Sequence, residues 1–530
     1  MTLSANGSGE SFRDQAKRLI EIAISLSAEL RLDVLLERIL VHARDLTLAD
    51  AGTLYLLKDG QLHFEILQNA TLGIALGGAT GKPILLDPVH LVRSNVCAYA
   101  AILGQTVSIE DVYSSRKFDF SGPRIYDRKT GYRSTSMLVV PMKNHEGNVI
   151  GVLQLLNAID PGSRAVIPFR PDLTALVEAL ASLAAVAIEN ATLIRETKDL
   201  FHSLVKVLAA AIDAKSHHTG NHVQRVALLN TFLAQTVNRA TEGPLREVTF
   251  SEKQMEEIYI AGWLHDIGKI TTPVNVMNKS TKLETIVDRI VLIETRFRLI
   301  AERLVNDALR RKLARAAGSP GGEEAGPEDE ELARSLGRID AAIGLVRACN
   351  QPGEFMNQAA VDGLNEVARA TFELDGRFEP YLTGDELENL CIRRGTLTEA
   401  ERLVMQEHIN WTIKLLTHIP CKGYLANVPL YAGQHHEKLN GKGYPAGATA
   451  ADIPIQSRIL AIADFYEALS AKDRPYKKPM TFEQITAILK ESAARNEIDP
   501  DLLDLIIREG AFEAFEREFE TLARDVISFR

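Results

Sequence analysis

The chain has 530 residues, of which 46% are hydrophobic and 25% charged, and its formal net charge is −10. This length predicts roughly three domains of globular protein, and the acidic balance gives no overall electrostatic reason to bind a nucleic-acid polymer or an anionic membrane. The four cysteines are scattered without a CxxC spacing, which excludes a zinc ribbon and fits a reducing compartment. Residues 1–30 lack a secretory pattern, and we find no stretch apolar enough to span a membrane, so a cytoplasmic protein is expected.

The first part of the chain predicts a short tail and then a helix. Residues 1–11 are mostly small and polar and are expected to be disordered, whereas residues 12–49 carry apolar residues at helical spacing. The pattern then changes to strands. The dipeptide Asp59-Gly60 favours a hairpin turn, and the residues on both sides of it, 52–57 and 62–67, have strand patterns.

A second hairpin is predicted around Asn144–Gly147, between 136–141 and 149–156. From residue 171 onward the pattern is helical again and rich in Ala and Leu. The order helix, antiparallel sheet, helix predicts an α+β sensor-like domain over residues 12–171.

A long helix is predicted over residues 172–215, with the length expected of a connector between a sensor and a downstream domain. A parallel homodimer would bury its apolar stripe; the alternative is that each half of the helix packs on its own domain. The stripe consists of Leu176, Leu180, Leu183, Val186, Ile188, Leu193, Ile194, Leu200, Leu204 and Leu208.

The remaining chain, residues 201–530, is predicted to be an all-α domain with one interruption. Residues 284–392 have charged helical patterns around a Gly-, Pro- and acid-rich run at 317–330, which is too polar to fold alone. We interpret 284–392 as an inserted helical hairpin with a flexible loop at its tip. The sequence leaves open whether it is a partner surface, a lid or a decoration.

The residues most indicative of chemistry are His265 and Asp266, which follow an apolar helical run and precede Lys269. Burying such a dyad is costly unless something compensates, and imidazole and carboxylate are both ligands of divalent metals. The other interpretation is a helix that ends in a solvated His–Asp pair.

Further histidines and an aspartate occur where they could complete a metal site. His222 opens a helix, and His218, four residues earlier, shares its face if that helix extends back. Five histidine and two aspartate positions suffice for two metal ions with one bridging carboxylate, which is the arrangement that activates water against phosphodiesters. The positions are His222, His265, His408, His435, His436, Asp266 and Asp464.

The N-terminal domain resembles the GAF domains of cyclic-nucleotide phosphodiesterases in the stretches Tyr126–Tyr132, 136–142 and 151–157. Those GAF domains often carry an Asn-Lys pair, whereas here Asn157 is followed by Ala158. The resemblance implies a cyclic nucleotide, another small ligand or a purely dimerising role. The alternative for 127–132 is a turn that packs against the sheet.

The C-terminal domain resembles the HD-GYP family, a branch of the HD phosphohydrolases. The resemblance rests on an ordered set of segments over about residues 201–290 and 393–490. These segments are Thr219–His222, Leu264–Lys269, His408, His435-His436, Gly443-Tyr444-Pro445, Ile462-Ala-Asp464 and Asp473-Arg-Pro-Tyr476.

The family resemblance implies a role for each matching residue. His222, His265, Asp266 and Asp464 would hold one metal ion, and Asp266 would bridge to a second ion held by His408, His435 and His436. Lys269 would bind or polarise the scissile phosphate, Arg474 and Lys477 would hold phosphates or guanine, and Tyr444 would shape the pocket. The metals would be two divalent ions, most often iron or manganese, with a third ion if His218 is also a ligand.

These resemblances predict a GAF-regulated phosphodiesterase that hydrolyses cyclic di-GMP to pGpG and onward to GMP in some members of the family. Two alternatives remain: a weakly active or inactive cyclic-dinucleotide-binding module that acts through partners, and a hydrolase of another cyclic dinucleotide such as cyclic GMP-AMP. Some residues depart from the family pattern, among them Glu467, which stands where a second aspartate is common, and the insertion after Lys282.

Overall fold

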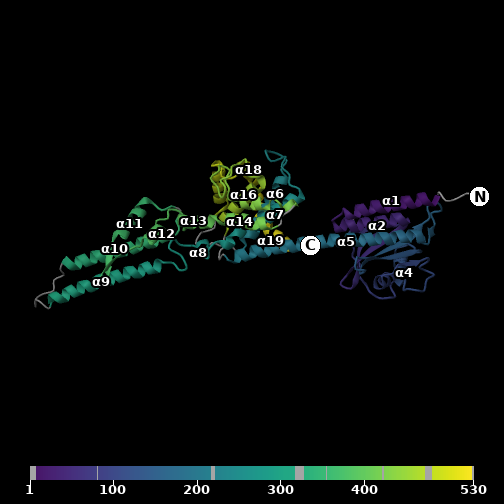
Figure 1. The fold of residues 1–530 in the computed structure, drawn as a ribbon, viewed down its shortest axis with the longest axis horizontal. Coiled ribbons are helices and arrows are strands. Elements are labelled where there is room, and N and C mark those ends of the chain that lie inside the picture. The colour runs from purple at the N-terminus through teal and green to yellow at the C-terminus, as the bar shows by residue number, and fades with distance from the viewer. Residues whose placement is uncertain are drawn as a thin grey trace, which may run out of the picture. The chain divides into compact units, whose positions relative to one another are not determined.

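The computed structural model describes residues 7–79, 81–215, 221–316, 327–353, 355–419, 423–471 and 480–527. The chain divides into two compact units, Met1–Leu200 and Phe201–Arg530, and the division falls within the long helix α5 (Pro171–Lys215) (Figure 1).

The first unit is built on an antiparallel sheet with the strand order β3-β2-β1-β7-β6-β5, in which β4 also pairs with β2 and β8 with β7. Both predicted hairpins are confirmed, β1–β2 and β6–β7. The strands are β1 Ala49–Lys58, β2 Gln61–Asn69, β3 Ile74–Gly77, β4 Val89–His90, β5 Val107–Ile109, β6 Met137–Lys143, β7 Val149–Ile159 and β8 Val166–Ile167.

Side chains alternate between the two faces of the sheet along each strand, and here both faces carry apolar side chains. Helices therefore cover both faces. In β6, Leu138 and Val140 belong to the core shared with α1 (Gly7–Ser27), α2 (Leu32–Thr47) and α5. Their neighbours Met137 and Val139 belong to a second core with α3 (Val96–Leu103). The helix α4 (Ser121–Thr130) completes this unit. The predicted α+β class is confirmed.

Some local predictions for this unit were wrong. The expected single helix over 12–49 is two helices, and α1 begins at Gly7, so residues 7–11 are helical rather than disordered. For the stretch 127–132 a turn was only the alternative, and residues 127–130 form the end of α4. By length and composition alone, a window of α5 also passes as a membrane span, contrary to our expectation. Core helices of soluble proteins pass the same test, and α5 packs one face into the core of its own unit.

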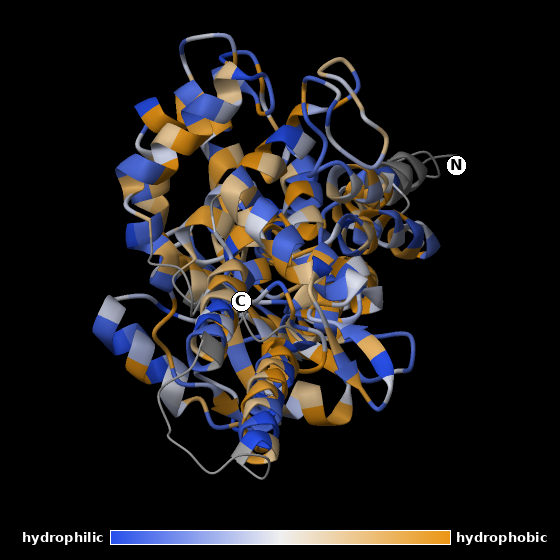
Figure 2. Cartoon of the chain, turned by 90° about the vertical axis from the view of Figure 1, so that its left-hand side faces the viewer, coloured by the Kyte–Doolittle hydropathy of each residue, from blue (hydrophilic) through white to orange (hydrophobic). Residues whose placement is uncertain are grey.

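The second unit is helical, as predicted, and its main core joins α5, α6, α7 and α14 to α19. Figure 2 shows hydrophobic and hydrophilic residues alternating along the helices, as packing around shared cores requires. These elements are α6 His222–Asn238, α7 Glu252–Leu264, the 3₁₀ helix η1 Ile267–Thr271, α8 Val274–Met277, α13 Glu399–Gln406, α14 His408–His418, η2 Gly423–Leu425, α15 Val428–Gly433, α16 Ile455–Ser470, α17 Phe482–Ala494, α18 Pro500–Arg508 and α19 Ala511–Ile527.

The insertion has a core of its own, in which α9 and α10 lie side by side (Figure 1). The inserted helical hairpin is therefore confirmed, with additions: a third helix, a two-stranded hairpin and a fourth short helix follow α10. Of the expected loop at 317–330, residues 317–326 lie outside the described residues, and 327–330 belong to α10. The elements are α9 Ile290–Ala316, α10 Pro327–Asn350, α11 Gln358–Arg369, β9 Thr371–Leu374, β10 Arg377–Pro380 and α12 Gly384–Leu390.

Buried ion pairs fix the base of the insertion. Arg296 of α9 contacts both carboxylate oxygens of Glu386, whose side chain is almost completely buried. The ammonium group of Lys279, also buried, donates hydrogen bonds to Asn389 and Glu401. Because Glu401 lies on α13, the helix just before His408, the base of the insertion is joined to a segment that carries a predicted metal ligand.

Candidate metal centre

The predicted ligand residues come from five separate segments and meet in one place. His222 is the first residue of α6, and His265 and Asp266 follow the last residue of α7. His408 is the first residue of α14, while His435 and His436 follow α15, and Asp464 lies inside α16. The side chains form two groups with ligand atoms within 4.8 Å of one another, one of His222, His265 and Asp266 and one of His408, His435 and His436.

Three of the histidines are oriented by the same kind of local hydrogen bond. The last carbonyl groups of a helix lack partners within the helix, and an imidazole N–H can satisfy one of them. The Nδ1 atoms of His265, His408 and His435 lie 2.7, 2.5 and 2.6 Å from the carbonyl oxygens of Gly262, Met405 and Ala432, three residues earlier in each case. When the imidazole is neutral and its proton lies on Nδ1, each Nε2 presents its lone pair to the centre, as a metal ligand must.

Asp464 lies beside the first group, so that two histidines and two carboxylates face one another. Nε2 of His222 lies 3.3 Å from Oδ1 of Asp464 and 3.6 Å from Oδ2 of Asp266. Nε2 of His265 lies 3.3 Å from the same oxygen of Asp266 and 3.7 Å from Oδ1 of Asp464. These separations are those expected of atoms placed around one common point.

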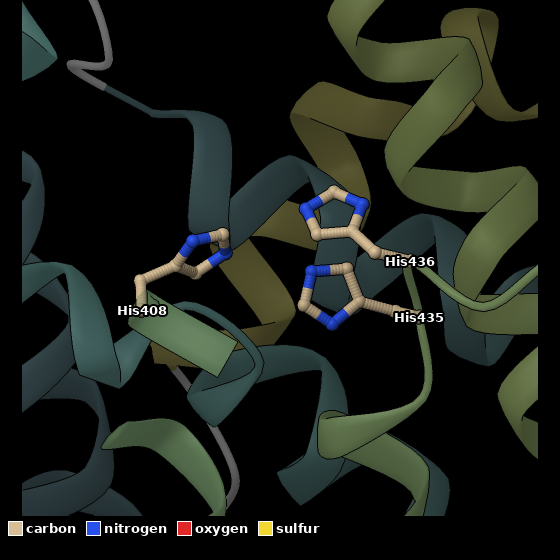
Figure 3. A group of neighbouring side chains, drawn as sticks. All are labelled: His408, His435 and His436. Carbon is tan, nitrogen blue, oxygen red and sulfur yellow. The ribbon is translucent and has the colours of Figure 1, made fainter. Parts of the chain in front are cut away.

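The second group lies on the other side of Asp266. Its remaining oxygen, Oδ1, is 3.4 Å from Nε2 of His408, so the two oxygens of this carboxylate face the two groups. Figure 3 shows His408 approaching from one segment and His435 and His436 from another, with the rings close together. The ring centroids of His435 and His436 are 4.2 Å apart.

Unsatisfied polar atoms support a metal at this place. Among the described residues, four buried atoms at the centre have no hydrogen-bond partner: Nε2 of His265, His408 and His435, and Oδ1 of Asp266. Buried polar atoms are nearly always paired, so four orphans that converge require an explanation. A mixed set of imidazole and carboxylate donors fits a divalent transition metal, and the residues present therefore fit the group that the sequence predicts.

The two groups differ in their electrostatics. Burial lowers the pKa of His265, but Asp266 and Asp464 outweigh this effect and raise it to about 9. Burial raises the pKa of Asp266, yet Lys269 and His265 outweigh burial and hold it well below its usual range. In the second group, burial lowers the pKa of His436 to about 4. The carboxylates therefore dominate the electrostatics of the first group, whereas burial favours the neutral form of His435 and His436 in the second.

The predicted substrate-contact residues have different outcomes. Nζ of Lys269 lies 2.5 Å from Oδ2 of Asp266, at the edge of the centre. The ring of Tyr444 lies 4.8 Å from that of His436, beside the second group. His218, Arg474 and Lys477 lie outside the described residues.

Sequence reasoning gave too little weight to Glu467. In the sequence it is only a departure from the family pattern, but its carboxylate is buried and hydrogen-bonded to Nδ1 of His222. It also lies 3.7 Å from Nε of Arg225. The available signal was its position three residues after Asp464, which puts both acids on the same face of α16.

Two further residues, Gly268 and Thr412, hold the halves of the centre together. The hydroxyl of Thr412 donates to the carbonyl of His265 (3.1 Å) and accepts from the N–H of Gly268 (3.0 Å). A Cβ atom on Gly268 would lie 1.9 Å from the carbonyl oxygen of His408, so a side chain here would separate the two segments. Thr412 does not stand out in the sequence, and the contact role of Gly268 within Leu264–Lys269 is not evident there, because the contact joins positions that are distant along the chain.

A cavity of about 2010 Å³ opens at the centre and is lined in part by His222, Asp266 and Lys269. It is larger than the roughly 300–1,000 Å³ of common small-molecule sites. Its other walls come from α5, α6, α16, α17 and α19 and from the base of the insertion.

Three parts of the chain match known families. Residues 31–188 match the GAF domain, and residues 219–342 and 382–502 match two families that are each described as an HD domain. The chain thus contains a match to the GAF domain followed by two matches to HD domains, which agrees with the resemblance predicted from the sequence. HD domains are metal-dependent phosphohydrolases, which agrees with the two groups of possible metal ligands.

Curated relatives are similar over short stretches. The 3'3'-cGAMP-specific phosphodiesterase 1 of Vibrio cholerae is 32% identical over 151 residues, which are 28% of this chain and 33% of that protein. The 3'3'-cGAMP-specific phosphodiesterase 2 of the same organism is 38% identical over 121 residues, 23% of this chain and 22% of that protein. The cGMP-specific 3',5'-cyclic phosphodiesterase of Drosophila erecta is 30% identical over 156 residues, 28% of this chain and 13% of that protein. The chain therefore covers a third or less of the length of these relatives.

Proposed function

We propose that the chain is a metal-dependent phosphodiesterase that hydrolyses a cyclic dinucleotide. The observation that supports this most directly is Asp266, whose two carboxylate oxygens face two separate groups of imidazole nitrogens. Two divalent ions held there, iron or manganese in our proposal, would supply the water activation and charge stabilisation that phosphodiester hydrolysis needs. Lys269 places a further positive charge beside them, and burial in a cavity strengthens its effect on a phosphate.

The cavity also supports a substrate larger than one mononucleotide. We propose cyclic di-GMP as the substrate, with pGpG as the first product and GMP as a second. A second candidate is 3'3'-cGAMP, favoured by the names of the relatives from Vibrio cholerae.

One competition experiment tests both candidates. The full chain is purified anaerobically, its metal content is measured, and it is incubated with equal concentrations of cyclic di-GMP and 3'3'-cGAMP. We expect pGpG to form from cyclic di-GMP with the larger kcat/KM. Faster consumption of 3'3'-cGAMP would reassign the substrate. Binding without turnover of either dinucleotide by metal-loaded protein would instead establish the alternative of an inactive binding module.

We propose that the GAF domain regulates this activity through α5, and that its ligand is a cyclic nucleotide or another small molecule. The final residue of α5, Lys215, supports a mechanical connection to the catalytic unit. Its ammonium group donates to the carbonyl oxygens of Lys269 (3.2 Å), Ile270 (2.6 Å) and Thr272 (2.7 Å). A displacement of the helix end would therefore act on the backbone that carries Lys269.

Asn157, part of the GAF resemblance, already has partners within the fold. Its side chain accepts from the N–H of Thr135 (2.7 Å) and donates to the carbonyl of Arg133 (2.7 Å). Its φ of 57° also lies in the left-handed region that asparagine tolerates. A structural role thus accounts for this residue, and a ligand of the GAF domain has to be sought by binding experiments on the full chain.

We also propose that the protein is a cytoplasmic homodimer joined along α5. Leu183, Val186, Leu193 and Leu200 repeat at heptad spacing and are 38%, 45%, 54% and 61% exposed. The opposite face of the helix, with Leu180, Ala184 and Ile188, is buried in the core of its own unit. Asn190 occupies the same stripe, and one polar residue in such a stripe specifies the register of two parallel helices.

A further inference from the structure

The insertion, together with the residues just after it, forms one wall of the cavity at the metal centre. Pro352, Gly353 and Phe355 follow α10, and Arg394 and Gly395 follow α12; all five line the same cavity as His222, Asp266 and Lys269. The insertion therefore borders the cavity and does not lie only on the outer surface of the domain.

Hydrogen bonds hold the two segments of this wall in place. The N–H of Met356 donates to the carbonyl of Arg393 (3.0 Å), and the guanidinium of Arg393 donates to Gln358 (2.7 Å). Three residues after Arg393, the hydroxyl of Thr396 donates to the carbonyl of Lys279 (2.9 Å). The side chain of Lys279 is in turn hydrogen-bonded to α12 and ion-paired with α13. The wall is thus part of the fixed base of the insertion.

Two residues of the wall have side chains suited to a ligand. Phe355 is 71% exposed, although it is a large aromatic residue. Arg394 is also exposed and makes no hydrogen bond or ion pair with any other described residue.

Several other cations that line the cavity are paired with carboxylates, whereas Arg517 donates to the carbonyl of Glu513 in its own helix. Lys269 is paired with Asp266, Lys438 with Glu497 and Arg225 with Glu516. Arg394 therefore offers the cavity a positive charge that no described carboxylate offsets.

We propose that the insertion and the residues just after it supply a nucleotide subsite, in which Phe355 stacks on a base and Arg394 binds a phosphate. This inference rests on the proposed function. A cyclic dinucleotide carries two phosphates, and only one of them can be at the metal centre while it reacts. The second negative charge requires another cation, and a guanidinium forms paired hydrogen bonds with phosphate oxygens. Base stacking on an aromatic side chain contributes affinity with little dependence on base identity.

The test measures binding separately from turnover. Cyclic di-GMP is titrated into the metal-free full chain by calorimetry, and KM and kcat are then measured with metal. Phe355→Ala and Arg394→Ala should each weaken binding and raise KM about 10-fold or more, as expected for losing one stacked base or one charge-assisted contact. The kcat should change less than about twofold, because neither residue touches the reacting bond. Arg394→Lys should recover part of the loss.

Matched controls come from β10 of the same insertion. Phe378 is 75% exposed and Arg377 is also exposed, and neither is among the described residues that line the cavity. Phe378→Ala and Arg377→Ala should bind like the wild type. Hydrolysis of a small phosphodiester without a nucleobase should be equal in all four variants.

The outcomes separate this inference from the proposed function. Unchanged affinity and KM in Phe355→Ala and Arg394→Ala would overturn the subsite while leaving the phosphodiesterase intact. A wild-type protein that binds cyclic di-GMP but never hydrolyses it would overturn the phosphodiesterase, and weakened binding by the two variants would still support the subsite. If the wild type bound no cyclic dinucleotide, the subsite would be overturned too.

Discussion

The carboxylate of Glu467 is hydrogen-bonded to Nδ1 of His222, and the two residues are 245 positions apart in the sequence. This contact fixes the ring so that Nε2 faces Asp266 and Asp464. A carboxylate behind a metal-binding histidine holds the ring in position and increases its basicity, and losing it commonly costs about 10–100-fold in metal affinity or activity.

Glu467→Ala is therefore expected to weaken metal binding by about 10–100-fold without unfolding the domain. The measurement is a competition titration with a metal-binding dye, together with circular dichroism to check helix content. Glu520→Ala is the matched control, because Glu520 is an exposed acid on α19. Equal metal affinity in both variants would show that Glu467 has no part in orienting His222.

His265→Ala and His408→Ala should each remove one of the two proposed metal ions. His265 belongs to the group with His222 and Asp266, whereas His408 belongs to the group with two other histidines. Each variant should lose about one ion per chain and most of its activity, while the helical fold persists, and Asp266→Ala should lose metal from both groups. The check is metal analysis of anaerobically purified protein; unchanged stoichiometry in all three variants would refute the ligand assignment.

Lys215→Met should lower kcat and stability together. The substitution keeps most of the side chain's length but removes three charge-assisted hydrogen bonds to the backbone of residues 269–272. Hydrogen bonds that involve a charged group contribute about 1.5–3 kcal/mol. We expect a loss of unfolding free energy of that order and a several-fold decrease in kcat, measured by urea titration and steady-state kinetics. An Arg195→Met control, on an exposed part of α5, should change neither.

The ion pair at the base of the insertion predicts a pH dependence. Burial raises the pKa of Glu386, but its contacts with Arg296 and the N–H of Thr383 outweigh burial and lower the pKa below 4.5. A carboxyl group whose folded pKa is lowered stabilises the protein above its unfolded pKa, and this stability is lost as pH falls through the folded pKa.

Glu386→Gln should therefore be less stable than the wild type at pH 7, with the difference shrinking below about pH 4.5, the ordinary range of a glutamate. Unfolding midpoints measured from pH 7 down to pH 3 give this comparison. Glu388→Gln is the control, because Glu388 is an exposed acid on the same helix. A difference for Glu386→Gln that stayed constant with pH would contradict the assigned ion pair.

Leu193→Asp should dissociate the proposed dimer. A charge at an exposed heptad position would have to be buried between two helices, which is costly without a partner. Sedimentation velocity of the full chain should show a dimer for the wild type and a monomer for this variant. Arg195→Asp, on the same helix but outside the stripe, should stay dimeric. A monomeric wild type at micromolar concentration would refute the proposal.

The sequence alone determined the order of the domains, both hairpins of the GAF sheet and the inserted hairpin. These features follow from local periodicity and turn residues such as Asp59-Gly60, which a single stretch of chain contains. The sequence also indicated which histidines and aspartates to examine, because a buried His–Asp dyad needs compensation wherever it lies.

Only the tertiary structure decided how these residues meet. Whether Asp266 faces one group or two depends on contacts between segments more than a hundred residues apart, such as that of Thr412 with His265. The same holds for Glu467, which was only a departure from a pattern until His222 was placed beside it. The position of the insertion beside the cavity also depends on such contacts. The ion pair of Lys279 with Glu401 links its base to α13, and no local pattern of residues encodes that contact.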